Sequence, residues 1–110
     1  MGTGSQSAMS DALARLWEKF LSEILQRVRV LENAAAALES GILDADDRLA
    51  AAAAAHKLAG VLGTFGLAEG TSLAREAEVA YSESTPPDAA GMARLQQIAR
   101  ELNELIRARG

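Results

Sequence analysis

Residues 51–66 read AAAAAHKLAGVLGTFG and contain His56, the only histidine of the chain. Alanine is the best helix former, and Leu58, Leu62 and Phe65 recur at intervals of four and three residues, so this stretch predicts an amphipathic helix. A helix turns about 100° per residue, which places Phe65 about 180° from His56 and Leu58 about 160° away. The imidazole is therefore expected on the face opposite the apolar ridge.

The helix face around His56 is expected to carry small, exposed side chains, which favours close approach by another protein. A glycine inside a helix costs about 1 kcal/mol relative to alanine, so Gly60 needs a reason, and docking of a partner is one. Close packing of a neighbouring helix is the alternative for Gly63 and Gly66. The residues within about 60° of His56 on the helical wheel are Leu49, Ala52, Ala53, Ala59, Gly60 and Gly63.

The composition is that of one small helical domain. The 110 residues are 49% hydrophobic but only 4% aromatic, which suits closely packed helices. The chain has no cysteine, so disulfides and thiolate metal sites are excluded and a reducing compartment is favoured. The net charge is −4 without a basic block, which argues against nucleic-acid binding. No apolar run reaches the ~18 residues of a membrane span and no signal peptide is visible, so we expect a cytoplasmic protein without a membrane contact.

Four amphipathic segments with short connections predict an all-α, antiparallel up-and-down four-helix bundle, and we expect a monomer. Residues 1–8 are interpreted as a flexible leader or a vector-derived remnant, and residues 9–110 as the bundle. The first helix covers residues 9–38, with a break or bend near Phe20 that would leave a short extra N-terminal helix. Gly41 is typical of its C-terminal stop.

The remaining helix ends are predicted from their capping residues. Asp44 is expected to cap the His56 helix, which should run to about Thr64. The next helix covers residues 67–82. In the last helix Thr85 is expected as N-cap, with Pro86 at the first helical position and Asp88 in the first turn.

The residues around His56 resemble a known family. His56-Lys57-Leu58-Ala59-Gly60, followed by Gly63-Thr64-Phe65-Gly66, is similar to the signature of histidine phosphotransfer (HPt) domains. It also resembles the phosphoacceptor domain of chemotaxis histidine kinases, in which a Gly-Thr-Phe-Gly stretch likewise follows the histidine. The motif covers less than a fifth of the chain.

The resemblance implies that His56 is the phosphoacceptor. Neutral imidazole offers a lone pair for in-line attack on phosphorus, and an unperturbed histidine titrates near pH 6.5. From the residues alone, three other readings of His56 stay open: a buried structural histidine, a metal ligand and a surface histidine without a role. A metal ligand would lack partners, because the chain has no second histidine and no cysteine.

In the chemotaxis kinase domains a glutamate on the following helix accepts a hydrogen bond from Nδ1 of the histidine. Glu78 stands at the matching interval, so the resemblance implies that it orients His56; the alternative is a solvated surface charge. Arg75 matches a second basic residue of those kinases and is expected either to attract phosphate or to pair with Glu78. Many members carry lysine three residues after the histidine, where this chain has Ala59. Lys57, about 100° round the helix, is then the nearest basic residue on the same helix.

The sequence therefore predicts a histidine phosphotransfer module of a two-component phosphorelay. It would take a phosphoryl group from a histidine kinase or a receiver domain and pass it to a receiver-domain aspartate. No P-loop or nucleotide lid is visible, so autonomous kinase activity is not expected, and no cofactor is expected in this domain because the partner receiver holds the Mg²⁺. The alternative is a helical adaptor that binds a signalling partner without phosphorylation.

Overall fold

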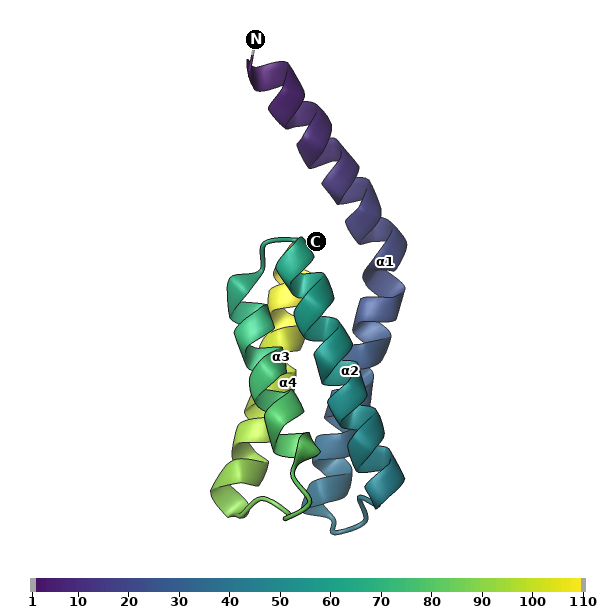
Figure 1. Ribbon diagram of the computed structural model, residues 1–110, viewed down its shortest axis with the longest axis vertical. Coiled ribbons are helices and arrows are strands. Elements are labelled where there is room, and N and C mark those ends of the chain that lie inside the picture. The colour runs from purple at the N-terminus through teal and green to yellow at the C-terminus, as the bar shows by residue number, and fades with distance from the viewer. Residues whose placement is uncertain (1, 110) are drawn as a thin grey trace.

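The computed structural model describes the backbone of residues 2–109 and the side chains of residues 8–109. Within these limits the chain forms four helices and no strand: α1 (Gly2–Glu39), α2 (Ala45–Thr64), α3 (Ala68–Ser82) and α4 (Ala89–Arg109). Successive helices run in opposite directions, and α1 and α3 each pack against α2 and α4 (Figure 1). This arrangement confirms the predicted antiparallel four-helix bundle.

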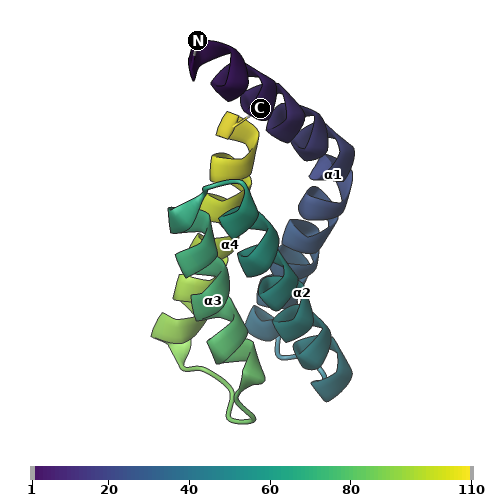
Figure 2. The same ribbon diagram turned by 45° about the horizontal axis from the view of Figure 1, so that its top comes forward.

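Helix α1 is longer than expected. Its 38 residues should span about 57 Å at ~1.5 Å per residue, and the longest dimension of the molecule is 57 Å. The ribbon curves where α1 leaves the bundle and its N-terminal part projects past the other helices (Figures 1 and 2). Because α1 is continuous, the break considered near Phe20 and the separate N-terminal helix are both absent.

Most of the segment interpreted as a leader, residues 1–8, is helical in the structure. Residues 2–8 belong to α1, while Met1 lies outside the described residues. No proline interrupts this part of the chain, and once a helix is nucleated each further residue adds a backbone hydrogen bond. Helical propagation therefore carries α1 past the point at which its apolar pattern begins.

All four helices contribute to a single hydrophobic core. Alanines of α2, such as Ala51 and Ala55, are completely buried and leave room for neighbouring helices to approach closely. The largest side chains that are almost fully buried are Trp17, Ile24, Val28, Leu58, Leu62, Ile98, Leu102 and Ile106.

Local capping chemistry sets the ends of α1 and α2. Asp44 Oδ1 accepts a hydrogen bond from the Asp47 backbone N–H at 2.7 Å, which confirms Asp44 as the N-cap of α2. Gly41 and Gly66 follow α1 and α2 at φ +73° and +76°. In both places the next N–H bonds a carbonyl five residues back, as in the Schellman motif.

The predicted start of α4 is wrong. Helix α4 begins at Ala89, and Asp88 is its cap because Asp88 Oδ1 accepts a hydrogen bond from the Gly91 N–H at 2.8 Å. Thr85 does not cap the helix. Pro86 precedes Pro87, and a residue before proline is disfavoured in the helical region, so the helix cannot start at Pro86.

Candidate functional site

His56 lies near the middle of α2 and points into solvent. Its side chain is 70% exposed. The completely buried Leu58 and Leu62 lie on the opposite side of α2, as the helical spacing predicts. This exposure excludes the buried structural histidine among the alternatives.

Glu78 of α3 contacts the imidazole directly. Its Oε2 lies 2.8 Å from His56 Nδ1, and its side chain is 28% exposed. A carboxylate can only accept a hydrogen bond, so Nδ1 must carry the proton of this contact. In the neutral imidazole the lone pair then resides on Nε2, which is left free to react.

The surface beside His56 is formed largely by small exposed residues of α2. Ala53, Gly60 and Gly63 are exposed, Ala52 is half-buried, and Leu49 is 54% exposed. A Cβ at Gly60 would meet no heavy atom within 4 Å, so Gly60 does not pack against a neighbouring helix.

Ala59 does not belong to this surface. It is only 2% exposed and lies in the core, which corrects its assignment to the docking face. The reason is that α2 is covered by α1 on one side and α3 on another, so its buried arc is wider than the Leu58–Leu62–Phe65 ridge. His56 consequently lies at the border between the exposed face of α2 and α3, where Glu78 can reach it.

Two basic side chains flank the site. Lys57 is exposed on α2 and Arg75 is exposed on α3, one turn before Glu78. The alternative in which Arg75 pairs with Glu78 is not found, because within residues 8–109 Arg75 forms no ion pair. In the described conformation both cations face solvent.

Polar contacts and close packing that the sequence did not predict hold α2 against α3. Thr71 Oγ1 donates a hydrogen bond to the Ala59 carbonyl at 3.1 Å, and Arg48 Nη1 donates to the carbonyls of Tyr81 and Glu83. At Gly70 a Cβ would come within 2.9 Å of Leu62 Cδ1, so the glycine lets α3 approach α2 without displacing the Leu62 side chain. Gly70 on the buried face of α3 was the one available signal of this approach.

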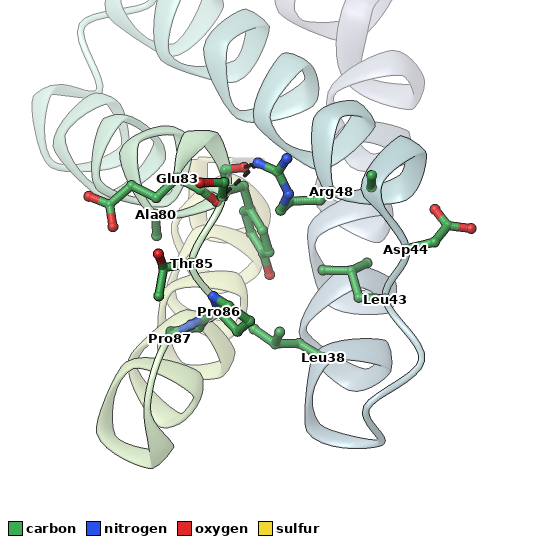
Figure 3. A pocket seen from close by; sticks show the side chains of 12 residues that line it. Leu38, Leu43, Asp44, Arg48, Ala80, Glu83, Thr85, Pro86 and Pro87 are labelled. Carbon is green, nitrogen blue, oxygen red and sulfur yellow. Dashed lines mark hydrogen bonds between the residues drawn. The ribbon is translucent and has the colours of Figure 1, made fainter.

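The pocket in Figure 3 is not the candidate site. It has a volume of about 240 Å³ and lies between the α1–α2 and α3–α4 connections. Neither His56 nor Glu78 lines it.

Within residues 2–109 no group of three or more histidine, aspartate or glutamate residues could hold a metal ion. In the same residues no helix combines the length and apolar character needed to cross a membrane.

Comparison of the chain with models of known protein families identifies the family to which it belongs. The model described as the Hpt domain matches residues 15–108. The chain belongs to the Hpt domain family. Neither the curated proteins nor the solved structures compared with the chain gave a match.

Hpt domains carry phosphoryl groups in phosphorelays, as carriers and not as autonomous enzymes. They interact with the kinases and receiver domains of two-component systems. The match begins at residue 15, close to Trp17, the first buried side chain among the described residues 8–109 of this Hpt domain. The family thus covers the bundle and leaves out most of the projecting part of α1.

Proposed function

We propose that this Hpt domain carries a phosphoryl group on Nε2 of His56, between a kinase or receiver donor and a receiver-domain aspartate. The observation that supports this most strongly is the 2.8 Å contact between His56 Nδ1 and Glu78 Oε2. It fixes the tautomer in which the exposed ring nitrogen keeps its lone pair.

In the transfer step the Nε2 lone pair attacks the phosphorus of the receiver's aspartyl phosphate in line with the leaving oxygen. A P–N bond forms, the P–O bond breaks, and the aspartate leaves as a carboxylate. The Nδ1 proton stays in place, so the phosphorylated ring gains a positive charge. The carboxylate of Glu78 stabilises this charge through the same hydrogen bond. Any Mg²⁺ belongs to the partner receiver.

The proposed docking surface is the exposed part of α2 around the imidazole. Gly60 and Gly63 keep the approach to Nε2 free of side chains, and the exposed apolar side chain of Leu49 offers a contact two turns away. Lys57 and Arg75 flank this surface and would attract the phosphoryl group and an acidic receiver site. Arg75 and Lys57 take the place of the lysine that many members carry where this chain has Ala59.

The test is transfer from a phosphorylated receiver domain. We expect the wild-type domain to become labelled and the His56→Gln variant to take no label while keeping the same helical circular-dichroism spectrum. The label should be labile in acid and stable in base, as a phosphoramidate is. Label that survives in His56→Gln would refute the assignment. A wild-type domain that binds the receiver but takes no label would favour the phosphorylation-independent adaptor.

A further inference from the structure

Glu78 lies close to the C-terminal end of α3, where the helix supplies no basic side chain of its own. Helix α3 ends at Ser82, only four residues after Glu78, and has no basic residue in its last turn. The last four carbonyls of a helix have no partner within the helix, and such ends fray. A shift of this turn would move Glu78 away from His56.

Arg48 supplies the missing partner from α2. Its Nη1 donates hydrogen bonds to the Tyr81 carbonyl at 2.8 Å and to the Glu83 carbonyl at 3.0 Å. Figure 3 shows the Arg48 side chain extended from α2 toward Glu83 at the end of α3. The planar guanidinium presents its donors in a fixed geometry, so it fixes the position of the helix end as well as neutralising its dipole. Arg48 lies eight residues before His56 on the same helix.

Thr71 makes the corresponding contact on the other side of the site. Its Oγ1 donates to the Ala59 carbonyl at 3.1 Å in a partly buried position, three residues after His56 on α2. This bond lies where α2 and α3 approach closely, next to Gly70. Arg48 and Thr71 thus join the same two helices on opposite sides of the His56–Glu78 pair.

We propose that Arg48 and Thr71 are positioning residues for the phosphoacceptor. They hold α2 and α3 at the separation at which Glu78 accepts a hydrogen bond from the protonated Nδ1 of His56, which leaves Nε2 of the imidazole free. A hydrogen bond is lost beyond about 3.5 Å, so the 2.8 Å contact tolerates a displacement of less than 1 Å. The inference rests on the proposed function of His56, but its effect on the tautomer exists without any partner.

The test measures the imidazole tautomer by nitrogen NMR in the isolated domain, at a pH where the ring is neutral, and the transfer rate from a phosphorylated receiver. Arg48→Gln and Thr71→Val should each lower the share of the Nδ1–H tautomer and slow transfer on the order of tenfold. Thr71→Ser and Arg48→Lys keep a donor and should restore much of both. These conservative variants also keep the test open should Arg48→Gln fail to fold.

Arg94→Gln is the matched control. Arg94 Nε and Nη2 donate to the Glu76 carboxylate at 2.7 and 2.8 Å, which joins α4 to α3 without involving α2. Its loss should leave tautomer and rate unchanged. The inference is overturned if folded Arg48→Gln and Thr71→Val domains keep the wild-type tautomer, or if Arg94→Gln changes it equally. If the wild-type domain takes no label but Arg48→Gln and Thr71→Val show the expected tautomer changes, the phosphotransfer function is refuted and the positioning role stands.

Discussion

Gly60 lies one turn after His56 on the exposed side of α2, and a Cβ there would meet no heavy atom within 4 Å. We therefore expect Gly60→Ala to raise the free energy of unfolding by about 0.5–1 kcal/mol, because alanine restricts the unfolded chain and favours the helix. Gly60→Gln should also fold, yet slow phosphotransfer markedly, because its side chain occupies the space that a receiver needs. Thermal unfolding and transfer kinetics of both variants check this.

The exposed Ala53 provides a comparison with Gly60 on the same face of the helix. Ala53→Gln adds a side chain one turn before His56, so equal slowing in Ala53→Gln and Gly60→Gln would indicate that the receiver covers α2 on both sides of His56. If Gly60→Ala and Gly60→Gln both lose stability and transfer, Gly60 packs against a neighbouring helix. The docking surface would then lie elsewhere on the bundle.

Tyr81 gives a prediction about stability at alkaline pH. Burial raises the pKa of Tyr81 to about 12, and its hydroxyl has no protein partner within the described residues. An unfolded tyrosine ionises near pH 10. The contribution of Tyr81 to the free energy of unfolding is therefore fully present below about pH 10. It falls by about 2 kcal/mol as the pH rises toward 12.

The comparison with Tyr81→Phe isolates this contribution. Phenylalanine removes an unpaired buried hydroxyl, so the variant should be at least as stable at neutral pH and should lose less stability between pH 10 and 12. Denaturant unfolding across this range measures the difference. Since Tyr81 is the only tyrosine, phenolate absorbance reports its ionisation, and titration near pH 10 in the folded protein would contradict the prediction.

At this scale helical spacing predicted that His56 is exposed, and the resemblance to the chemotaxis kinase domains implied its contact with Glu78; the structure confirms the exposure and the contact. It could not predict the burial of Ala59. The alanine run of α2 has no contrast between apolar and polar positions, so the width of the buried arc depends on how α1 and α3 cover α2. The Arg48 and Thr71 contacts depend on the relative placement of two helices, which no local pattern encodes.

Among the elements, α1 divides into a part that packs and a part that projects. From residue 8 onward, Trp17 is the first fully buried side chain of α1, whereas Met9 is 68% and Leu16 42% exposed. Removing residues 1–10 should change the melting temperature by no more than about 3 °C, because surface changes alter stability by less than ~0.5 kcal/mol. Transfer should be unaffected, since this segment is outside the residues matched to the family.

A chain that begins after Phe20 is the control for this truncation. It loses Trp17, whose ring lies 5.1 Å from that of Phe65 in an edge-to-face arrangement. Loss of a buried tryptophan costs about 3–5 kcal/mol, so this shorter chain should unfold at a much lower temperature. A large loss of stability on removing residues 1–10 alone would show that the projecting part packs against the bundle.

The helix ends show which local signals are reliable. Asp44 and Gly41 were predicted from residue type, because a capping carboxylate and a glycine at positive φ act within one turn. The start of α4 was missed because Thr85 and Asp88 are both good caps by type. The Pro86–Pro87 pair decides between them through its restriction of the backbone.

On the scale of the whole molecule, the bundle presents the exposed His56 imidazole on α2, in contact with Glu78 of α3. The four-helix architecture followed from the spacing of apolar residues in the sequence. Trp17, Phe65 and Arg109 close one end of the bundle, with the guanidinium carbon of Arg109 4.9 Å from the Trp17 ring centroid. The proposed phosphotransfer takes place at the surface of α2 and α3, where His56 and Glu78 are in contact.

Phosphorus–nitrogen coupling in the phosphorylated domain, labelled with nitrogen-15 in its single histidine, locates the P–N bond directly. Glu78 holds Nδ1 of His56 at 2.8 Å, so we predict phosphorus bonded to Nε2, with the Nδ1 proton retained. Phosphorus on Nδ1, or on a residue other than His56, would contradict the proposed role of the His56–Glu78 pair.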